Sequence, residues 1–166
     1  MNVSRYFNEA LVKLEMETVI EPQGEEESLA KFQQRSKEAV LDELVNLLET
    51  GNRFGNHNKL IIDFVNRERK ATTGIGHGVA IPHVRTMQAK EFIIAFARST
   101  AGYEFEAMDG EPVHLFFIMA APPYDDTLYL RIFKSLAEML QYESFRNELM
   151  TLKSPGELIR ALRSME

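Results

Sequence analysis

Alternation between apolar and polar positions predicts a chain of helices separated by short apolar strands. The most regular helical stretch covers residues 37–49. Its apolar residues recur at the spacing of a single helix face: Val40, Leu41, Leu44, Leu47 and Leu48. We expect Ser36 to be the N-cap of this helix and Gly51 its C-cap, because both residue types favour those positions.

Helical spacing also appears on both sides of the chain's middle. We expect a short amphipathic turn at residues 3–10 and a second full helix from residue 58 to about 69. A third helix is expected over 127–142, with Asp125 or Asp126 as its cap. Two shorter helices complete the pattern: 144–151, and 155–163 with Ser154 as N-cap and Pro155 at its first position.

Four apolar stretches have the character of strands. Residues 11–17 alternate as a half-buried strand does, whereas 79–81, 92–97 and 113–120 are continuous apolar runs, typical of strands covered on both faces. Residues 102–105 either add an edge strand or form a loop. Because helices precede, separate and follow these strands, the pattern predicts an α/β domain with helices on both faces of its sheet.

Composition narrows the class of protein. The 166 residues are 45% hydrophobic, which is enough for one compact core. A formal net charge of −6 argues against nucleic-acid binding, since phosphate neutralisation needs clustered Lys and Arg. The lack of cysteine excludes disulfides and thiolate chemistry. No apolar run of about 18 residues and no signal-peptide core occur, so we expect a cytoplasmic protein without membrane insertion.

Residues 73–85 hold the most unusual local pattern. Gly74, Gly76 and Gly78 allow positive φ angles and close approach of the backbone. Pro82 has no N–H, so the strand ladder is expected to end near it, with His83 presented at the strand's exit. The plain alternative is an ordinary histidine in a turn.

Several familiar sites do not fit these residues. The glycine turn lacks the Gly-Lys-Ser/Thr ending of a P-loop and precedes a strand, which argues against a nucleotide. His77 and His83 have no third ligand in phase, so no metal site is expected. His114, within an apolar strand, is expected to be structural, with a pocket wall as the alternative. His57 is most simply an exposed loop residue.

The remaining chemistry centres on His83 between two arginines. A neutral imidazole with a pKa near ~6.5 is a nucleophile, and guanidinium groups at Arg67 and Arg85 stabilise phosphoryl charge. Backbone N–H groups of the turn at Gly76 and Gly78 could cradle phosphoryl oxygens. These residues suit a phosphorylated histidine and require neither metal nor cofactor. A plainer explanation for the basic residues 67–70 is the cationic last turn of a helix.

These motifs resemble a known family. Arg67-Glu68, the glycine turn, Val-Ala-Ile-Pro-His at 79–83, Asp-Gly-Glu-Pro at 109–112 and Ala-Ala-Pro at 120–122 are similar to the enzyme IIA domain of the bacterial phosphoenolpyruvate:sugar phosphotransferase system (PTS). The resemblance is to the fructose-mannitol and nitrogen-regulatory branch (EIIA type 2), and it extends over residues 3–163. It implies one domain over 1–166, a three-layer α/β/α sandwich with a mixed, mainly buried sheet.

The resemblance also implies roles and partners. His83 would accept phosphate from the carrier HPr or its nitrogen-branch relative, and Arg67 would contact that phosphate. In sugar-transporting members the phosphate passes to a cysteine of a IIB domain. Gly76, Gly78, Arg85 and Tyr129 are candidates for the phosphoryl pocket or the partner face.

Three features depart from the family pattern. Val84 replaces the usual small residue after Pro-His, which would crowd the partner or tilt the imidazole. Tyr129 stands where many members have a second histidine, so it offers one hydroxyl hydrogen bond and no charge. Residues from about 18 to 35 exceed the family's connection; within them 21–28 read as an exposed acidic loop whose charge is explained by solvation.

Three functions therefore stay open. The first is a phosphocarrier with a regulatory output, through a transporter, kinase or transcription factor; the expected lack of a IIB or membrane segment and Tyr129 favour it. The second is a sugar-specific IIA component that passes phosphate to a IIB cysteine. The third is a degenerate binding module that is not phosphorylated, suggested by Val84 and Tyr129.

Overall fold

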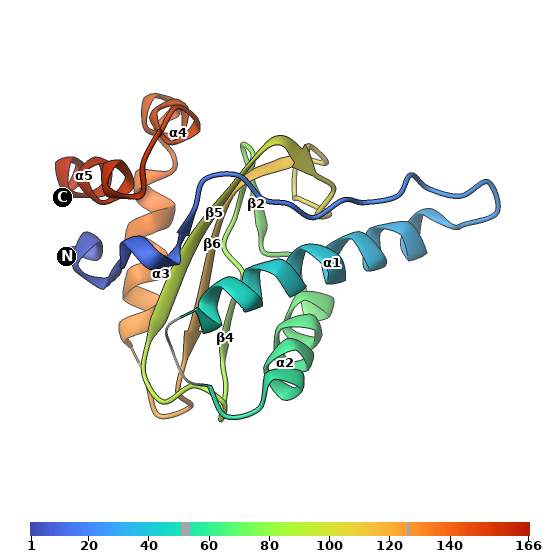
Figure 1. The fold of residues 1–166 in the computed structure, drawn as a ribbon, viewed down its shortest axis with the longest axis horizontal. Helices are drawn as coiled ribbons and strands as arrows, with labels where there is room; N and C mark the ends of the chain where they lie inside the picture. The colour runs from blue at the N-terminus through green and yellow to red at the C-terminus, as the bar shows by residue number, and fades with distance from the viewer. Residues whose placement is uncertain (51–53, 126) are drawn as a thin grey trace.

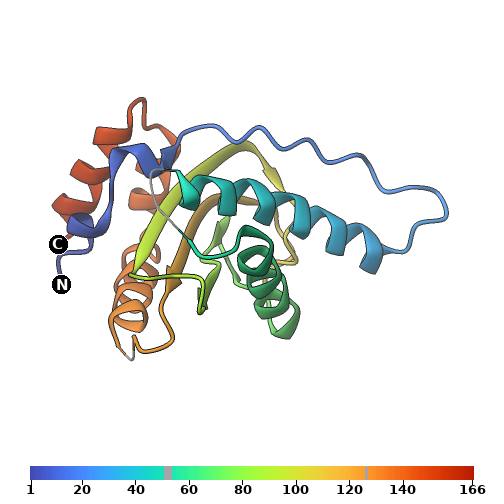
Figure 2. The same ribbon diagram turned by 60° about the horizontal axis from the view of Figure 1, so that its bottom comes forward.

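A mixed β-sheet separates two layers of helices (Figure 1). The computed structural model describes residues 1–50, 54–125 and 127–166. Helices α1 (Leu29–Glu49) and α2 (His57–Lys70) cover one face of the sheet. Helices α3 (Leu128–Met139), α4 (Glu143–Met150) and α5 (Pro155–Met165) gather on the other side (Figures 1 and 2). This arrangement confirms the three-layer α/β/α fold with a mixed sheet.

The described sheet has six strands, with β6 at its centre. Its order is β1 (Val12–Lys13), β5 (Ile93–Tyr103), β6 (Val113–Ala121), β3 (Val79–Ala80) and β2 (Gly74–Gly76), and β4 (His83–Arg85) also pairs with β6. Strands β5 and β6 are antiparallel, whereas β3 and β4 both run parallel to β6. Since β5 occupies one side of β6, β3 and β4 follow one another along its other side.

Alternate residues of β6 point into two separate cores. Phe116 and Ile118 pack with apolar residues of α1 and α2, while Phe117 and Met119 pack with those of α3, α4 and α5. Successive side chains of a strand point to opposite faces of a sheet, so a strand with helices on both faces must be apolar throughout. This is the reason for the continuous apolar run at 113–120.

Helix α1 is longer than its apolar stripe. The sequence predicts a start at Ser36, but α1 begins at Leu29, and the hydroxyl of Ser28 accepts a hydrogen bond from the Lys31 N–H at 3.1 Å. Only the later turns face the core, so the buried stripe gave no signal for the first two. Thus the inserted segment is an extended loop only as far as Ser28, and its last residues are helical. The predicted cap at Gly51 lies outside the described residues.

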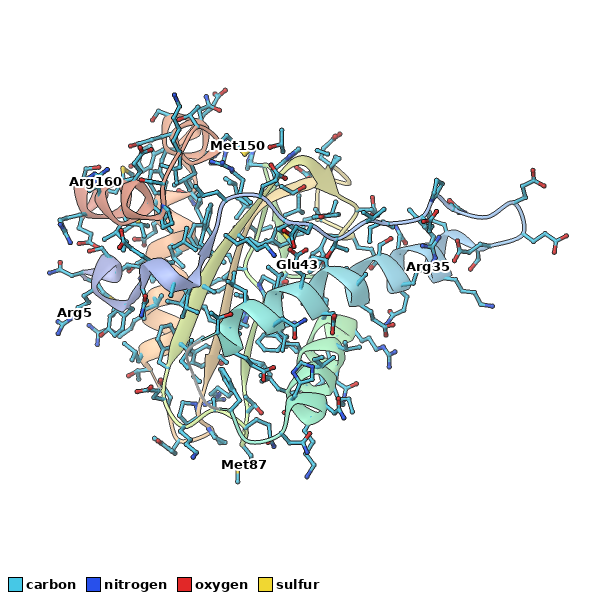
Figure 3. All side chains as sticks on the ribbon, viewed as in Figure 1. Arg5, Arg35, Glu43, Met87, Met150 and Arg160 are labelled. Atoms are coloured by element: carbon cyan, nitrogen blue, oxygen red, sulfur yellow. The ribbon has the colours of Figure 1, made fainter. Side chains whose placement is uncertain are left out.

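The acidic segment runs beside the projecting end of α1 (Figures 1 and 3). The guanidinium of Arg35 donates two hydrogen bonds to the Glu27 carboxylate, both at 2.8 Å, and holds the pKa of that carboxyl at about 2. Arg35 also donates to the carbonyl of Pro22 at 3.1 Å. These contacts join the acidic segment, residues 21–28, which we call the acidic arm, to α1, although this arm makes little contact with the core.

Other boundaries differ from the sequence prediction at the strands. The first strand is confined to β1, shorter than 11–17. Residues 102–103 are the end of β5 rather than a separate edge strand, and Tyr103 pairs with Val113 after an irregularity in register. Residues 74–76, predicted as part of a turn, form strand β2 of a hairpin with β3. Short strands have few residues with which to establish a period, which explains these differences.

The observed helices agree more closely with the sequence prediction than the strands do. Helix α2 starts one residue earlier than expected, with the side chain of Asn56 accepting from the Lys59 N–H at 3.0 Å, so His57 is helical rather than a loop residue. The N-cap of α3 is Thr127 rather than the predicted Asp125, although the Asp125 carboxylate accepts a hydrogen bond from the Leu128 N–H at 2.9 Å. The alternative cap, Asp126, lies outside the described residues. Among the described residues, no helix is both long and apolar enough to cross a membrane.

The two chain ends lie side by side (Figure 1). The backbone N–H and the hydroxyl of Ser4 donate to the two carboxylate oxygens of Glu166, at 2.5 and 3.0 Å. The first turn of the chain, the 3-10 helix Val3–Tyr6, is thereby joined to the end of α5.

The close approach of Gly74 to the β5–β6 connection yields a stability prediction. A Cβ at Gly74 would lie 2.8 Å from the Cα of Ala107, which is backbone and cannot rotate away. We expect Gly74→Ala to lower the free energy of unfolding by about 1–3 kcal/mol in urea denaturation. The control is Gly24→Ala in the acidic arm, where the nearest atom is 3.5 Å away and the change should stay within about 1 kcal/mol. Equal effects of the two substitutions would contradict the packing described here.

Candidate functional site

His83 begins strand β4, which continues the line of β3 along β6. Val79 and Ala80 pair with Leu115 and Phe116, and His83 pairs with Met119. Pro82, between the two strands, accepts a hydrogen bond from the Met119 N–H through its carbonyl at 2.9 Å. Pro82 has no N–H to donate to β6, but its carbonyl keeps the strand hydrogen-bonded, so the ladder does not end there. This corrects the prediction of a strand exit, since His83 opens a second short strand.

The imidazole of His83 is held by one hydrogen bond and two aromatic rings. Its Nδ1 lies 2.7 Å from the carbonyl oxygen of Ile81. Because a carbonyl can only accept, Nδ1 carries the proton and Nε2 keeps its lone pair. The ring centroid lies 4.8 Å from that of Phe133 and 6.1 Å from that of Tyr129, both on α3. The ring is thus held so that Nε2 is the nitrogen that keeps a lone pair.

His83 is half-buried, and this lowers its pKa. Removal from water disfavours the imidazolium and is the largest effect on the pKa of His83; the Ile81 carbonyl opposes it, the positive charge of Arg67 lowers the pKa by less, and Glu68 raises it least. A lowered pKa keeps the imidazole neutral at pH 7. The neutral ring is the form that can act as a nucleophile.

A cavity of about 850 Å³ joins His83 to Arg67. It is lined by the outer side of α2, by β4 and the residues after it, and by the start of α3. The cationic side chains lining it are those of Lys59, Arg67, Lys70 and Arg85. One carboxylate, Asp63, also faces it, and this group accepts a hydrogen bond from the Thr86 hydroxyl at 2.5 Å. In a chain of net charge −6, this cavity is locally positive and suits an anion.

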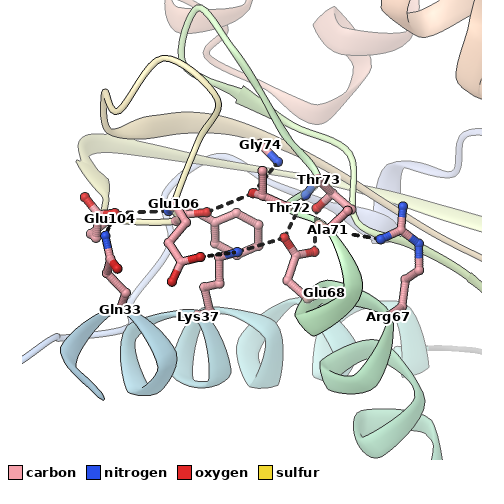
Figure 4. Close-up of polar contacts among 11 residues, drawn as sticks. Gln33, Lys37, Arg67, Glu68, Ala71, Thr72, Thr73, Gly74, Glu104 and Glu106 are labelled. Carbon is pink, nitrogen blue, oxygen red and sulfur yellow. Dashed lines mark hydrogen bonds and ion pairs between the residues drawn. The ribbon is translucent and has the colours of Figure 1, made fainter. Parts of the chain in front are cut away.

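Arg67 and Glu68 are neighbours in the sequence but face different surroundings (Figure 4). Arg67, in the last turn of α2, donates to the carbonyl of Ala71 at 2.9 Å and lines the cavity. Glu68 is buried, and it accepts from the N–H and from the hydroxyl of Thr73, both at 2.7 Å. Glu68 therefore ties the chain after α2 to the helix that carries Arg67.

Lys37 of α1 neutralises the buried Glu68 (Figure 4). Its ammonium lies 3.2 Å from Glu68 and 3.6 Å from Glu106, and 5.2 Å from the ring centroid of Phe105. Both Lys37 and Glu68 are only 5% exposed. A buried charge is tolerated when it is paired and hydrogen-bonded. This cluster binds α1, α2 and the β5–β6 connection together behind Arg67.

The structure separates the glycine turn from His83. Gly76 and Gly78 have positive φ angles of 95° and 77°, with His77 between them at 56°. The His77 N–H donates to the carboxylate of Asp109 at 2.9 Å, and the Gly78 carbonyl accepts from the N–H groups of β6. Neither glycine lines the cavity with His83, because β3 and Pro82 lie between. The expectation that this turn cradles the phosphoryl group is corrected, since its role is to reverse the chain between β2 and β3.

The other predicted residues are placed as follows. Arg85 and Tyr129 line the same cavity as His83, whereas His114 does not, and its Nδ1 lies 2.9 Å from the carbonyl of Ser99. His57 pairs with Glu49 at the start of α2. Val84 packs against the core beneath α1 and α2, while the imidazole of His83 contacts α3. Adjacent side chains point to opposite faces of a strand, but Val84 is only partly buried and also lines the cavity that contains His83.

Sequence reasoning missed three contributors to the site. Phe133 lies four residues after Tyr129 and so shares its helix face, a spacing that could have indicated it. The bond between Asp63 and Thr86 anchors the end of β4 to α2. The pairing of Lys37 with Glu68 joins residues 31 positions apart, and no local pattern signals such a contact.

Three comparisons place these features among known proteins. Residues 25–165 match the family model described as phosphoenolpyruvate-dependent sugar phosphotransferase system, EIIA 2. The chain is 34% identical over 128 residues to the PTS system fructose-specific EIIABC component of Bacillus subtilis, covering 77% of this chain and 20% of that protein. It is thus similar to a fifth of that longer protein.

Two further matches are of similar size to this chain. The PTS system fructose-specific EIIA component of Haloferax volcanii is 33% identical over 119 residues, which cover 72% of this chain and 77% of that protein. The crystal structure of nitrogen regulatory protein IIA-Ntr from Neisseria meningitidis superposes with a TM-score of 0.79 at 29% identity, over 96% of this chain and 98% of that chain.

The buried pair behind Arg67 yields a second prediction. Lys37→Met leaves the Glu68 carboxylate buried without its counter-charge, so we expect the free energy of unfolding to fall by about 3–5 kcal/mol. Adding Glu68→Gln removes that charge, and the double variant should recover part of the loss in urea denaturation. As a control, Glu38→Gln breaks the exposed pair with Arg69 and should cost at most about 1 kcal/mol. A double variant no more stable than Lys37→Met would contradict this account.

The lowered pKa of His83 gives a third prediction. In an NMR titration the His83 ring should change its protonation at a midpoint below 6.5, and Arg67→Gln should raise that midpoint. The unfolded chain binds this proton near pH ~6.5 while the folded chain does not, so His83 costs stability as the pH falls below that value. Wild type should therefore lose more unfolding free energy than His83→Gln below pH 6.5. Parallel pH profiles, or a midpoint above 6.5, would contradict the burial described here.

Proposed function

The chain belongs to the EIIA 2 family of the phosphoenolpyruvate-dependent sugar phosphotransferase system, and from this we propose that it carries a phosphoryl group on His83. The family consists of EIIA-type phosphocarriers, and it includes sugar-specific and nitrogen-regulatory relatives of this chain. The observation that supports His83 most directly is the hydrogen bond from Nδ1 to the Ile81 carbonyl. It leaves the Nε2 lone pair available in a ring that lines a cationic cavity.

The proposed step is a transfer between two imidazoles. The lone pair of Nε2 attacks the phosphorus of a phosphohistidine on a carrier of the HPr type. A bond from phosphorus to Nε2 forms as the bond to the carrier's nitrogen breaks, and that electron pair returns to the carrier's ring. The proton on Nδ1 stays in its bond to Ile81, and Arg67 stabilises the charge on the phosphoryl oxygens by hydrogen bonds to its guanidinium.

The rim of the cavity supports docking of such a carrier. Ile62 on α2 and Met87 after β4 line the cavity and are 54% and 81% exposed. Figure 3 shows Met87 projecting from the end of the molecule where β4 ends. Exposed apolar residues around a charged centre are typical of a protein-binding surface.

We propose a regulatory output as the first of two alternatives. In this case the phosphorylated and unphosphorylated forms differ in binding to a transporter, kinase or transcription factor, and Tyr129 in place of a second histidine suits slower onward transfer. In the alternative, the phosphate passes to a IIB cysteine, which the similarity to fructose-specific components supports. A module that is never phosphorylated is the remaining alternative, because Val84 both packs against the core and lines the cavity.

The fourth prediction tests the phosphoacceptor. Incubation with a phosphorylated carrier of the HPr type should add one acid-labile phosphate, which His83→Gln abolishes because no other described ring combines a free nitrogen with this cavity. Two-dimensional NMR should place the phosphate on Nε2. His57→Gln is the matched control, because His57 lies outside the cavity and its loss should leave transfer unchanged. Undiminished labelling of His83→Gln, or phosphate on Nδ1, would refute the assignment. A second experiment, in which a IIB domain is added to the phosphorylated protein, separates the regulatory output from onward transfer to a IIB cysteine.

A further inference from the structure

The arrangement of Arg85 and Tyr129 beside His83 suggests how the phosphoryl charge is stabilised without a second histidine. We propose that Arg85 is the second cation that contacts the phosphoryl group on His83, and that the ring of Tyr129 is the positioning residue that holds its guanidinium. This inference rests on the proposed function of His83.

Strand geometry places Arg85 next to His83. The two residues are separated by one position in β4, and residues two apart in a strand point to the same face. Both side chains do reach α3: the His83 ring lies 6.1 Å from the ring of Tyr129, and the Arg85 guanidinium carbon lies 5.5 Å from that same ring. Tyr129 is thus the neighbour that the nucleophile and the cation share.

The contact with Tyr129 is of the cation–π type. A guanidinium within about 6 Å of an aromatic centroid is attracted by the negative face of the ring. Stacking limits the rotamers of a long side chain, so less entropy is lost when the guanidinium then binds an anion. A neutral tyrosine cannot supply charge, but it can fix the position of a charge supplied by β4.

Most donors of Arg85 are uncommitted. In the described parts of the chain its side chain makes one hydrogen bond, at 3.4 Å to the carbonyl of Asp125, and no ion pair with a carboxylate. A guanidinium has five N–H donors, so it can still offer a bidentate contact to an oxyanion. Arg67, on α2, reaches the same cavity from the other side of β4. The two arginines would contact the phosphoryl group from opposite sides.

The chemical consequence is that the second cation of the site is a guanidinium and not an imidazolium. A second histidine loses its positive charge near pH ~6.5, whereas a guanidinium stays protonated to pH ~12 and above. Stabilisation of the phosphoryl dianion by Arg85 should therefore be the same from pH 7 to pH 9. Tyr129→His combined with Arg85→Gln should convert the site to one that depends on pH.

The test uses the full chain and two phosphoryl donors. One is a phosphorylated HPr-type carrier, and the other is phosphoramidate, a small donor that needs no docking and releases ammonia as its phosphorus bonds to Nε2. Mass spectrometry follows the rate of phosphate gain on His83 at about pH 6, pH 7 and pH 9, and thermal unfolding checks that each variant is folded. Transfer from phosphoramidate but not from any carrier would refute the proposed carrier function while still testing Arg85.

We expect Arg85→Gln to slow phosphorylation about 10- to 100-fold with either donor, as loss of a hydrogen bond to a charged group does. Tyr129→Leu should slow it in the same direction, and Tyr129→Phe should keep the rate within about threefold because the ring face remains. In the double variant Arg85→Gln, Tyr129→Leu the loss of rate should be less than the two single losses combined, since both substitutions remove the same contact.

Two variants decide whether the effect is specific. Arg131→Gln removes the same charge from the exposed side of α3, outside the cavity, and should leave the rate unchanged. Arg85→Gln, Tyr129→His should recover transfer only below about pH 6.5. The proposal is overturned if Arg85→Gln phosphorylates at the wild-type rate, if Arg131→Gln is equally slow, if the two losses simply add, or if neither donor phosphorylates His83.

Discussion

Parallel pairing with one buried strand determines where the imidazole of His83 lies. β6 is hydrogen-bonded to β5 on one side, and on the other it accommodates β3 and then β4, with Pro82 at the junction. The Ile81 N–H donates to the Thr73 carbonyl, away from β6, and the Ile81 carbonyl on that same edge accepts from the imidazole of His83. The edge of the strand opposite β6 therefore orients the ring and leaves its Nε2 unprotonated.

The second constraint is electrostatic and acts from the opposite layer. Two consecutive residues of α2 separate their charges: Arg67 faces the cavity, and Glu68 faces the interior, where Lys37 neutralises it. The positive charges that line the cavity repel one another, so other contacts have to hold the helix that carries them in place. The bonds from Thr73 to Glu68 supply that anchor, so the site's positive charge depends on a negative charge buried one residue away.

The elements that the sequence predicts correctly are those with a repeating apolar pattern, and the features that it misses have no such pattern. Long amphipathic helices such as α2, and the continuous apolar run of β6, follow from periodicity within a few residues. The start of α1 was misplaced because its first turns bury nothing, and β4 was missed because three residues cannot show a period. The residue pattern placed Arg67 beside His83, and the motif resemblance supplied its role as a phosphate contact. Long-range pairs such as Lys37 with Glu68 depend on the tertiary fold and leave no local trace.

The contact of Ser4 with Glu166 makes the backbone nearly a closed ring. A short bridge between the two ends would complete that ring with little loss of entropy, and the exposed acidic arm is a place where it could be opened again. Such a rearranged chain would keep every strand neighbour of β6. The adjacency of β3, β4 and β6, which positions His83, would pass intact through that change of topology.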